Sequence, residues 1–201
     1  MPAERLDPST TGLIVFDMQK GQLGIPWRKQ FLDETDIVQK CAELIALARE
    51  KGMPIFYVEN VRQQNGKDQP PVITDESIAN AGKAPDVSTI PAAERMDTLD
   101  ELKPEPQDFR VGKIRWGSFH YTQLESLLRT NRIDTVIMSG VRTQVGVETT
   151  LRDGRELGFN MIAARDATGG CPQDLHNYLM DNVFPLFCRV RTVAQLREML
   201  A

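Results

Sequence analysis

Cysteine and histidine are scarce in this sequence of 201 residues. There are three cysteines, Cys41, Cys171 and Cys188, and two histidines, His120 and His176. An odd number of cysteines without paired spacing argues against a disulfide framework and favours the reducing cytoplasm as the location of the protein. Two histidines are too few for a histidine-rich metal site. We therefore expect no bound metal ion and no other cofactor.

Long apolar runs and an excess of basic residues are also missing. No apolar run approaches the roughly 18 residues that a membrane-spanning helix needs. The first residues, MPAERLDPSTTG, have no apolar core of the kind found in a secretory signal. The net charge is -4 at pH 7, whereas nucleic acids and anionic membrane surfaces attract basic patches. We expect neither nucleic acid nor a membrane as a partner, and we expect a small-molecule substrate.

What the chain does contain is an alternation of short apolar runs with segments of helical periodicity. The apolar runs are typical of buried strands, and they lie at residues 11–17, 53–60, 108–113, 134–140 and 159–167, with a short edge strand at 188–192. Helical spacing is found at residues 33–52, 118–132, 143–158, 172–187 and 192–200, where Thr192 is the expected N-cap. Residues 61–106 are polar and predict long loops with one or two short helices.

This alternation predicts the fold class. Strands that are apolar on both faces and follow one another through helices form a mostly parallel, doubly wound α/β sheet with helices on both faces. No internal repeat and no break in composition indicates a second domain, so we expect one domain over residues 1–201. In such sheets ligands bind outside the carboxyl ends of the strands. The polar residues expected there are Asp17, Asn60, Lys113, the turn at 140–142 and Asp166.

Asp17 and Lys113 are the candidates for acid–base chemistry. Burial at the end of an apolar strand favours the protonated form of a carboxylate, which makes Asp17 a candidate acid or base. A helix N-cap or a salt-bridge partner is an equally good interpretation of Asp17 alone. If their strands are adjacent, Lys113 can meet Asp17 and stabilise developing negative charge. On its own, a solvated lysine is the simpler interpretation of Lys113.

The stretch SGVRTQVG, residues 139–146, turns from a strand into a helix. The first amides of a helix favour an anion, although a tight turn and a cap explain Gly140 and Thr143 equally well. Gly146 lies inside the predicted helix, where glycine costs about 1 kcal/mol relative to alanine. We infer that some other group approaches the backbone closely at Gly146. The two histidines are expected to be packing or surface residues, and Trp116 is a candidate for a pocket wall.

Four segments carry a family resemblance: LIVFDMQ, VGKIRWGSFHYTQLESLL, SGVRTQVGVETTLRDGRELGF and ARDAT. In this order and spacing they resemble the signature segments of the isochorismatase-like, or cysteine hydrolase, superfamily. The similarity extends over nearly the whole chain from Thr11 and is weakest at residues 61–106. It implies a Rossmann-like, doubly wound sheet of about six parallel strands, and a homodimer or homotetramer.

The resemblance also implies residue roles. Asp17 and Lys113 match the catalytic Asp and Lys, whereas Gly146 stands where most members have the nucleophilic Cys. A cis peptide between Val141 and Arg142 is implied at the same turn. The residues implied to bind substrate are Asn60, Trp116, Val141, Arg142 and Gln144.

Glycine at the nucleophile position resembles the isochorismatase branch, which hydrolyses a vinyl ether by protonating a carbon and needs no thiol. Our leading hypothesis is a hydrolase that cleaves a vinyl-ether acid resembling isochorismate, with Asp17 as general acid. A non-catalytic relative that binds a ligand is the second hypothesis. An amidohydrolase-like member whose Cys is replaced by Gly146 is the third.

Overall fold

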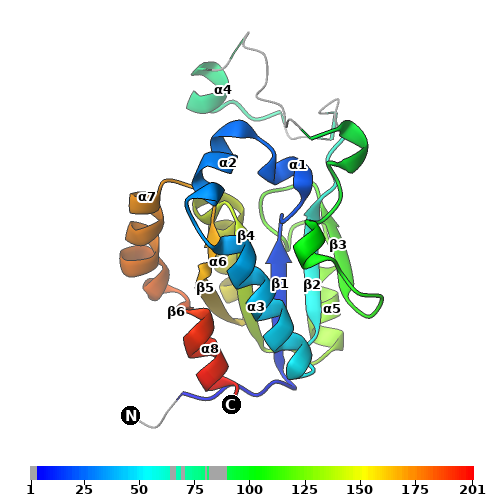
Figure 1. Ribbon diagram of the computed structural model, residues 1–201, viewed down its shortest axis with the longest axis vertical. Coiled ribbons are helices and arrows are strands. Elements are labelled where there is room, and N and C mark those ends of the chain that lie inside the picture. Colours follow the sequence, from blue (N-terminus) through cyan, green and yellow to red (C-terminus); the bar gives the residue numbers. More distant parts are fainter. Residues whose placement is uncertain (1–3, 64–66, 69–70, 80, 82–89) are drawn as a thin grey trace.

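The computed structural model describes residues 4–63, 67–68, 71–79, 81 and 90–201, and this part of the chain contains a six-stranded sheet. Every strand pairs in parallel with its neighbours, in the order β3-β2-β1-β4-β5-β6 (Figure 1). The strands are β1 (Thr11–Phe16), β2 (Ile55–Asn60), β3 (Phe109–Lys113), β4 (Thr135–Val141), β5 (Asn160–Gly169) and β6 (Arg189–Arg191). The predicted doubly wound, parallel sheet is confirmed, and its order is the Rossmann order.

Helices cover both faces of this sheet, as Figure 1 shows. On one face lie α3 (Ile37–Glu50) and α8 (Val193–Met199), and on the other lie α5 (Leu124–Thr130) and α6 (Glu148–Glu156). The remaining α-helices are α1 (Lys20–Leu23), α2 (Pro26–Asp33), α4 (Asp75–Ala79) and α7 (Gln173–Tyr178). Among the described residues, no helix has the length and apolarity needed to cross a membrane.

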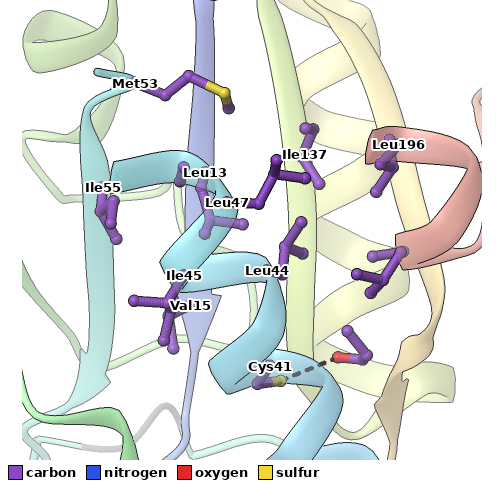
Figure 2. Close-up of a cluster of buried hydrophobic side chains, with 14 of the residues drawn as sticks. Leu13, Val15, Cys41, Leu44, Ile45, Leu47, Met53, Ile55, Ile137 and Leu196 are labelled. Atoms are coloured by element: carbon purple, nitrogen blue, oxygen red, sulfur yellow. Dashed lines mark hydrogen bonds between the residues drawn. The ribbon is translucent and has the colours of Figure 1, made fainter. Parts of the chain in front are cut away.

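Alternation along β1 divides the core into two apolar clusters. Leu13 and Val15 point towards α3 and belong to the cluster shown in Figure 2. Ile14 and Phe16 point to the opposite face and pack in the cluster beneath α5 and α6. All six residues of β1 are buried, and a fully buried Leu or Phe contributes about 1.5–3 kcal/mol relative to an exposed one. β1 therefore lies in the middle of the core, with one apolar cluster on each face of the sheet.

Three predicted helices differ from the observed ones. The helix expected at 118–132 begins only at Leu124. Thr122 Oγ1 donates to the carbonyl oxygen of Ser118 and accepts from the Leu124 amide, and Tyr121 has a φ of 59°, which a helix does not allow. The helix expected at 143–158 starts with a wide π-helical turn, Thr143–Val147. The helix expected at 172–187 is broken into α7, a π-helical turn and a short 3-10 turn that contains Pro185. A proline removes a backbone donor and crowds the preceding turn, so a regular helix ends there.

The start of α8 offers a test of the predicted cap. The Thr192 side chain accepts a hydrogen bond from the Gln195 amide, and the Gln195 side chain accepts one from the Thr192 amide. Thr192→Ala should therefore lower the free energy of unfolding by about 1 kcal/mol, measured by urea denaturation. Thr130→Ala, at an exposed threonine near the end of α5, is the control and should change it by less than about 0.5 kcal/mol. Equal effects would contradict the cap.

Candidate active site

In this strand order, the chain leaves β1 towards one side of the sheet and leaves β4 towards the other. The sheet therefore has a topological switch point between β1 and β4. Ligands of open α/β sheets bind outside the carboxyl ends of the strands at such a point. Asp17 follows β1 there with a φ of 53°. The turn from β4 into Thr143–Val147 lies beside it, because Phe16 pairs in register with Gly140. The candidate site therefore lies at the carboxyl ends of β1 and β4, next to the switch point of the sheet.

A buried ion pair joins two of the predicted residues. Lys113 Nζ lies 2.9 Å from Asp17 Oδ2, and the side chains are only 3% and 13% exposed. Their strands are not adjacent, because β2 lies between β1 and β3. With about 4.8 Å between neighbouring strands, the long lysine side chain is what lets the two groups meet. Lys113 Nζ also donates to the carbonyl oxygen of Arg115 and lies 4.4 Å from the centroid of the Phe16 ring.

A cavity of about 50 Å³ opens beside this pair. Its lining residues are Asp17, Gln22, Asn60, Arg62, Lys113, Trp116, Arg142, Val145 and Gly146. Small-molecule sites usually measure about 300–1,000 Å³, so this cavity has room for a reacting group rather than a whole substrate. A second cavity of about 280 Å³ shares Arg62 and Trp116 with it and is also lined by Val72 and Tyr121. A substrate can place its reacting group in the first cavity and its remainder in the second.

The turn that carries Gly146 differs from expectation in two ways. No peptide bond among the described residues is cis, so the expected cis bond between Val141 and Arg142 is wrong. The chain changes direction instead through positive φ values, 116° at Gly140 and 61° at Arg142. The amides of Val145 and Val147 both donate to the Arg142 carbonyl oxygen, at 3.1 and 3.3 Å. Those two amides are used within the turn and cannot hold an anion.

Gly146 is where another group approaches the backbone, as its place in a helix predicts. A Cβ atom at Gly146 would lie 2.5 Å from both Cε1 and Cζ of Phe16 and 3.2 Å from the carbonyl oxygen of Trp116. The carbonyl oxygen of Gly146 accepts a hydrogen bond from Thr150 Oγ1, which in turn accepts one from the Ser118 amide. The loop after β3 is thereby attached to the turn, and no side chain fits at position 146 without rearrangement.

The charges of the cavity favour an anionic ligand. Besides the ion pair, the lining contains the guanidinium groups of Arg62 and Arg142. Burial lowers the pKa of both arginines, and the nearby Asp17 carboxylate opposes that shift in each. Arg62 Nε donates to the carbonyl oxygen of Ile114 at 3.0 Å, and Arg62 lines both cavities. Three cationic side chains and one carboxylate thus surround the reacting group.

This geometry can be compared with known proteins. The isochorismatase domain family matches residues 11–195 of the chain. The protein belongs to the isochorismatase family. It is 31% identical to the isochorismatase family protein YecD of Escherichia coli O157:H7 over 97% of this chain and 98% of YecD. It is 30% identical to the ureidoacrylate amidohydrolase RutB of Methylobacterium radiotolerans over 97% of this chain and 81% of RutB.

Solved structures of the isochorismatase family have the same fold. An isochorismatase family protein from Burkholderia thailandensis is similar with a TM-score of 0.83 and 28% identity, over 98% of each chain. A cysteine hydrolase from Pseudomonas syringae pv. phaseolicola is similar with a TM-score of 0.77 and 25% identity, over 99% of this chain and 97% of that one. The chain is therefore an isochorismatase-family hydrolase in fold and sequence.

Not every residue predicted for this isochorismatase-family site lines the cavity. Asn60, Trp116 and Arg142 join Asp17, Lys113 and Gly146 there. Val141 and Gln144 do not line it. Val141 is 1% exposed and packs in the core on the α3 side, because it continues the inward-facing alternation of β4. The Gln144 side chain lies within the turn, where its Oε1 is buried without a hydrogen-bond partner among the described residues. Asp166 accepts a hydrogen bond from the Val193 amide at the start of α8, so its role is structural.

Sequence reasoning missed five residues of this isochorismatase-family site: Phe16, Gln19, Gln22, Arg62 and Val145. Gln19 is 2% exposed and its amide group bonds both the N–H and the C=O of Asn60, which ties the end of β1 to the end of β2. The sequence offered a signal for Gln19, because it lies two positions after Asp17 and both follow the same buried strand. Arg62 gave no signal because it stands in a polar segment without periodicity.

A second cluster supports the turn from behind. Thr143 Oγ1 lies 3.0 Å from His176 Nδ1 and donates to the carbonyl oxygen of Gly169 at 3.2 Å. Burial lowers the pKa of His176, with Arg165 adding to the effect. Burial also raises the pKa of the Cys171 thiol, which does not line the cavity. His176 is thus the packing residue that was expected. Among the described residues, no group of three or more His, Cys, Asp or Glu side chains is arranged to hold a metal ion.

The buried His176 predicts how stability depends on pH. Because its pKa is lowered in the folded protein, the unfolded chain takes up a proton first as the pH falls. Its contribution to stability is complete above about pH 6.5 and is lost as the pH falls below that value, by at most about 1.4 kcal/mol per pH unit. His176→Gln should flatten the dependence of the unfolding free energy on pH between 7.5 and 5, relative to the wild type. The exposed Thr130→Ala variant removes no titratable group and should keep the wild-type slope; a flattened slope in both variants would contradict this assignment.

Proposed function

We propose that the protein hydrolyses a small anionic substrate with Asp17 as the proton donor and without a covalent intermediate, and that a vinyl ether resembling isochorismate is the preferred class. The observation that carries this proposal is the combination of a buried Asp17–Lys113 pair with a glycine at position 146 whose side-chain space is taken by Phe16. A cavity without a thiol among its lining residues has no means of forming a thioester. It retains the groups that proton transfer requires.

Vinyl-ether hydrolysis needs only proton transfer and water. Asp17 protonates the terminal carbon of the carbon–carbon double bond, which leaves an oxocarbenium ion at the carbon that bears the ether oxygen. Water adds to that carbon and returns a proton to Asp17. The resulting hemiketal breaks its carbon–oxygen bond to release a keto acid and an alcohol. Lys113 lies next to Asp17 and stabilises the carboxylate that forms when Asp17 gives up its proton, and Asn60, Arg62 and Arg142 orient the anionic substrate.

Amide hydrolysis is the alternative that a specific observation favours, because RutB of Methylobacterium radiotolerans is named an amidohydrolase. Without a thiol, Asp17 would have to act as a general base and activate a water molecule that attacks the carbonyl carbon directly. A protein that binds an anion and catalyses nothing is the remaining hypothesis. Assays with vinyl-ether acids and ureido acids as substrates distinguish these three hypotheses.

The Asp17 carboxyl group should be essential in either reaction. Asp17→Asn preserves size but cannot exchange a proton with the substrate, so we expect kcat to fall by about 10²–10⁴. Cys171→Ala and Cys188→Ala are the controls and should retain turnover, because neither thiol lines the cavity. Loss of turnover in the cysteine variants, or wild-type kcat in Asp17→Asn, would contradict the proposed mechanism.

Arg62 should contribute to binding of the substrate anion. A charge-assisted hydrogen bond contributes about 1.5–3 kcal/mol, so Arg62→Gln should raise KM for an anionic substrate by about 10-fold to 100-fold. The same substitution should raise KM far less for a neutral ester of that substrate. Arg155→Gln, at an exposed arginine of α6 that pairs with Glu156, is the matched control. Equal losses for the acid and its ester would show that Arg62 does not bind the anion.

We further propose a homodimer or homotetramer that acts on this small molecule in the cytoplasm. Large apolar side chains that the described part of the chain exposes to solvent support self-association, because exposed apolar groups often mark contact surfaces. They include Val72, Ile73, Ile78, Trp116 and Tyr121.

A further inference from the structure

We propose that Phe16 is the specificity-determining residue of this site: its ring occupies the space of a side-chain nucleophile at position 146 and so restricts the cavity to reactions in which water attacks. The inference rests on the proposed function for the identity of the reaction, but its steric part stands on the geometry alone. Phe16 directly precedes Asp17, so one strand end supplies both the proposed acid and the group that excludes the thiol.

The overlap between Phe16 and a side chain at position 146 is large. A Cβ atom there would lie 2.5 Å from two ring carbons, about 1 Å closer than the 3.4 Å at which ordinary contact begins. Glycine at this helical position would otherwise be unfavourable by about 1 kcal/mol relative to alanine. The ring therefore explains why glycine, and not alanine or cysteine, is found at this position.

Neither partner can easily withdraw from this contact. Phe16 is fully buried in the cluster beneath α5 and α6. Its backbone is fixed on both sides, because it pairs with Val58 on β2 and with Gly140 on β4. On the other side, Gly146 is held by the bond from Thr150 to its carbonyl oxygen. Close-packed interiors tolerate an added methyl group poorly when the surrounding backbone cannot move.

The same ring also contacts the ion pair. Lys113 Nζ lies 4.4 Å from the centroid of the Phe16 ring, within the range of a cation–π interaction. Rotating the ring away from position 146 would therefore disturb the ammonium group that pairs with Asp17. The Phe16 ring thus has two effects on the site. It contacts the Lys113 ammonium, and it occupies the space that a thiol at position 146 would need.

A double-mutant cycle on stability tests the steric coupling without any substrate. Gly146→Ala should lower the urea midpoint of unfolding in the wild-type background, although alanine is the better helix former. In the Phe16→Val background, the same change should lower the midpoint much less or raise it. Gly154→Ala is the matched control, because the Cβ it adds on α6 would meet Met161 and not Phe16; its effect should be equal in both backgrounds. Equal effects of Gly146→Ala in both backgrounds would overturn the proposal.

A labelling experiment tests whether removing the ring restores space for a thiol. Gly146→Cys and Phe16→Val/Gly146→Cys are prepared with Cys171 and Cys188 replaced by serine, and each is treated with iodoacetamide. The thiolate displaces iodide and forms a thioether, whose amount is measured by mass spectrometry. We expect labelling to be at least tenfold faster in the double variant, because the thiol then enters a cavity lined by Lys113 and Arg142.

The outcomes distinguish this inference from the proposed function. A single Gly146→Cys variant that has the wild-type midpoint and labels as fast as the double variant overturns the inference. A single variant that does not fold, together with a folded double variant, supports it, and a double variant that stays unfolded contradicts it. None of these readouts depends on hydrolysis, so an inactive protein would contradict only the proposed function.

Discussion

The contact between the Lys113 ammonium and the Asp17 carboxylate is the constraint on which the rest of the site depends. An ion pair this well buried is worth its desolvation only if the two groups are held in good geometry, and loss of either partner typically costs about 3–5 kcal/mol. The two groups come from β1 and β3, so the pair also requires β2 to keep its place between them. Gln19 secures that arrangement by bonding the Asn60 backbone at the end of β2.

The cavity is shaped around this pair by backbone rather than by long side chains. Gly140 packs against the backbone of Phe16, since a Cβ there would lie 2.1 Å from the Phe16 carbonyl oxygen. Gly146 then passes over the Phe16 ring, and the carbonyl oxygen of Arg142 accepts hydrogen bonds from two amides of the wide turn at Thr143–Val147. The resulting space admits a small reacting group next to the carboxylate. Two arginines, Arg62 and Arg142, are among the residues that line this space.

Relatives of this chain in the isochorismatase family carry names that indicate different reactions. One relative is named a ureidoacrylate amidohydrolase, and a similar solved structure is named a cysteine hydrolase. The family thus indicates hydrolysis, while the choice of bond depends on what stands beside Asp17 and Lys113. In this chain a glycine and a phenylalanine ring stand there. Our proposal of acid-catalysed ether cleavage rests on that local arrangement and on the two arginines that line the cavity.

The sequence by itself determined the alternation of strands and helices and the positions of Asp17, Lys113 and Gly146, because strand burial, helix periodicity and the cost of a helical glycine are local properties of the chain. It did not determine that β2 lies between β1, which precedes Asp17, and β3, which ends at Lys113, that Arg62 reaches the cavity, or that Val141 points into the core. The contact between Phe16 and Gly146 joins residues 130 positions apart, and the turn beside it forms through positive φ values without a cis bond. Only the packing of whole elements could decide these features, since strand order and side-chain overlap arise between segments that are distant along the chain.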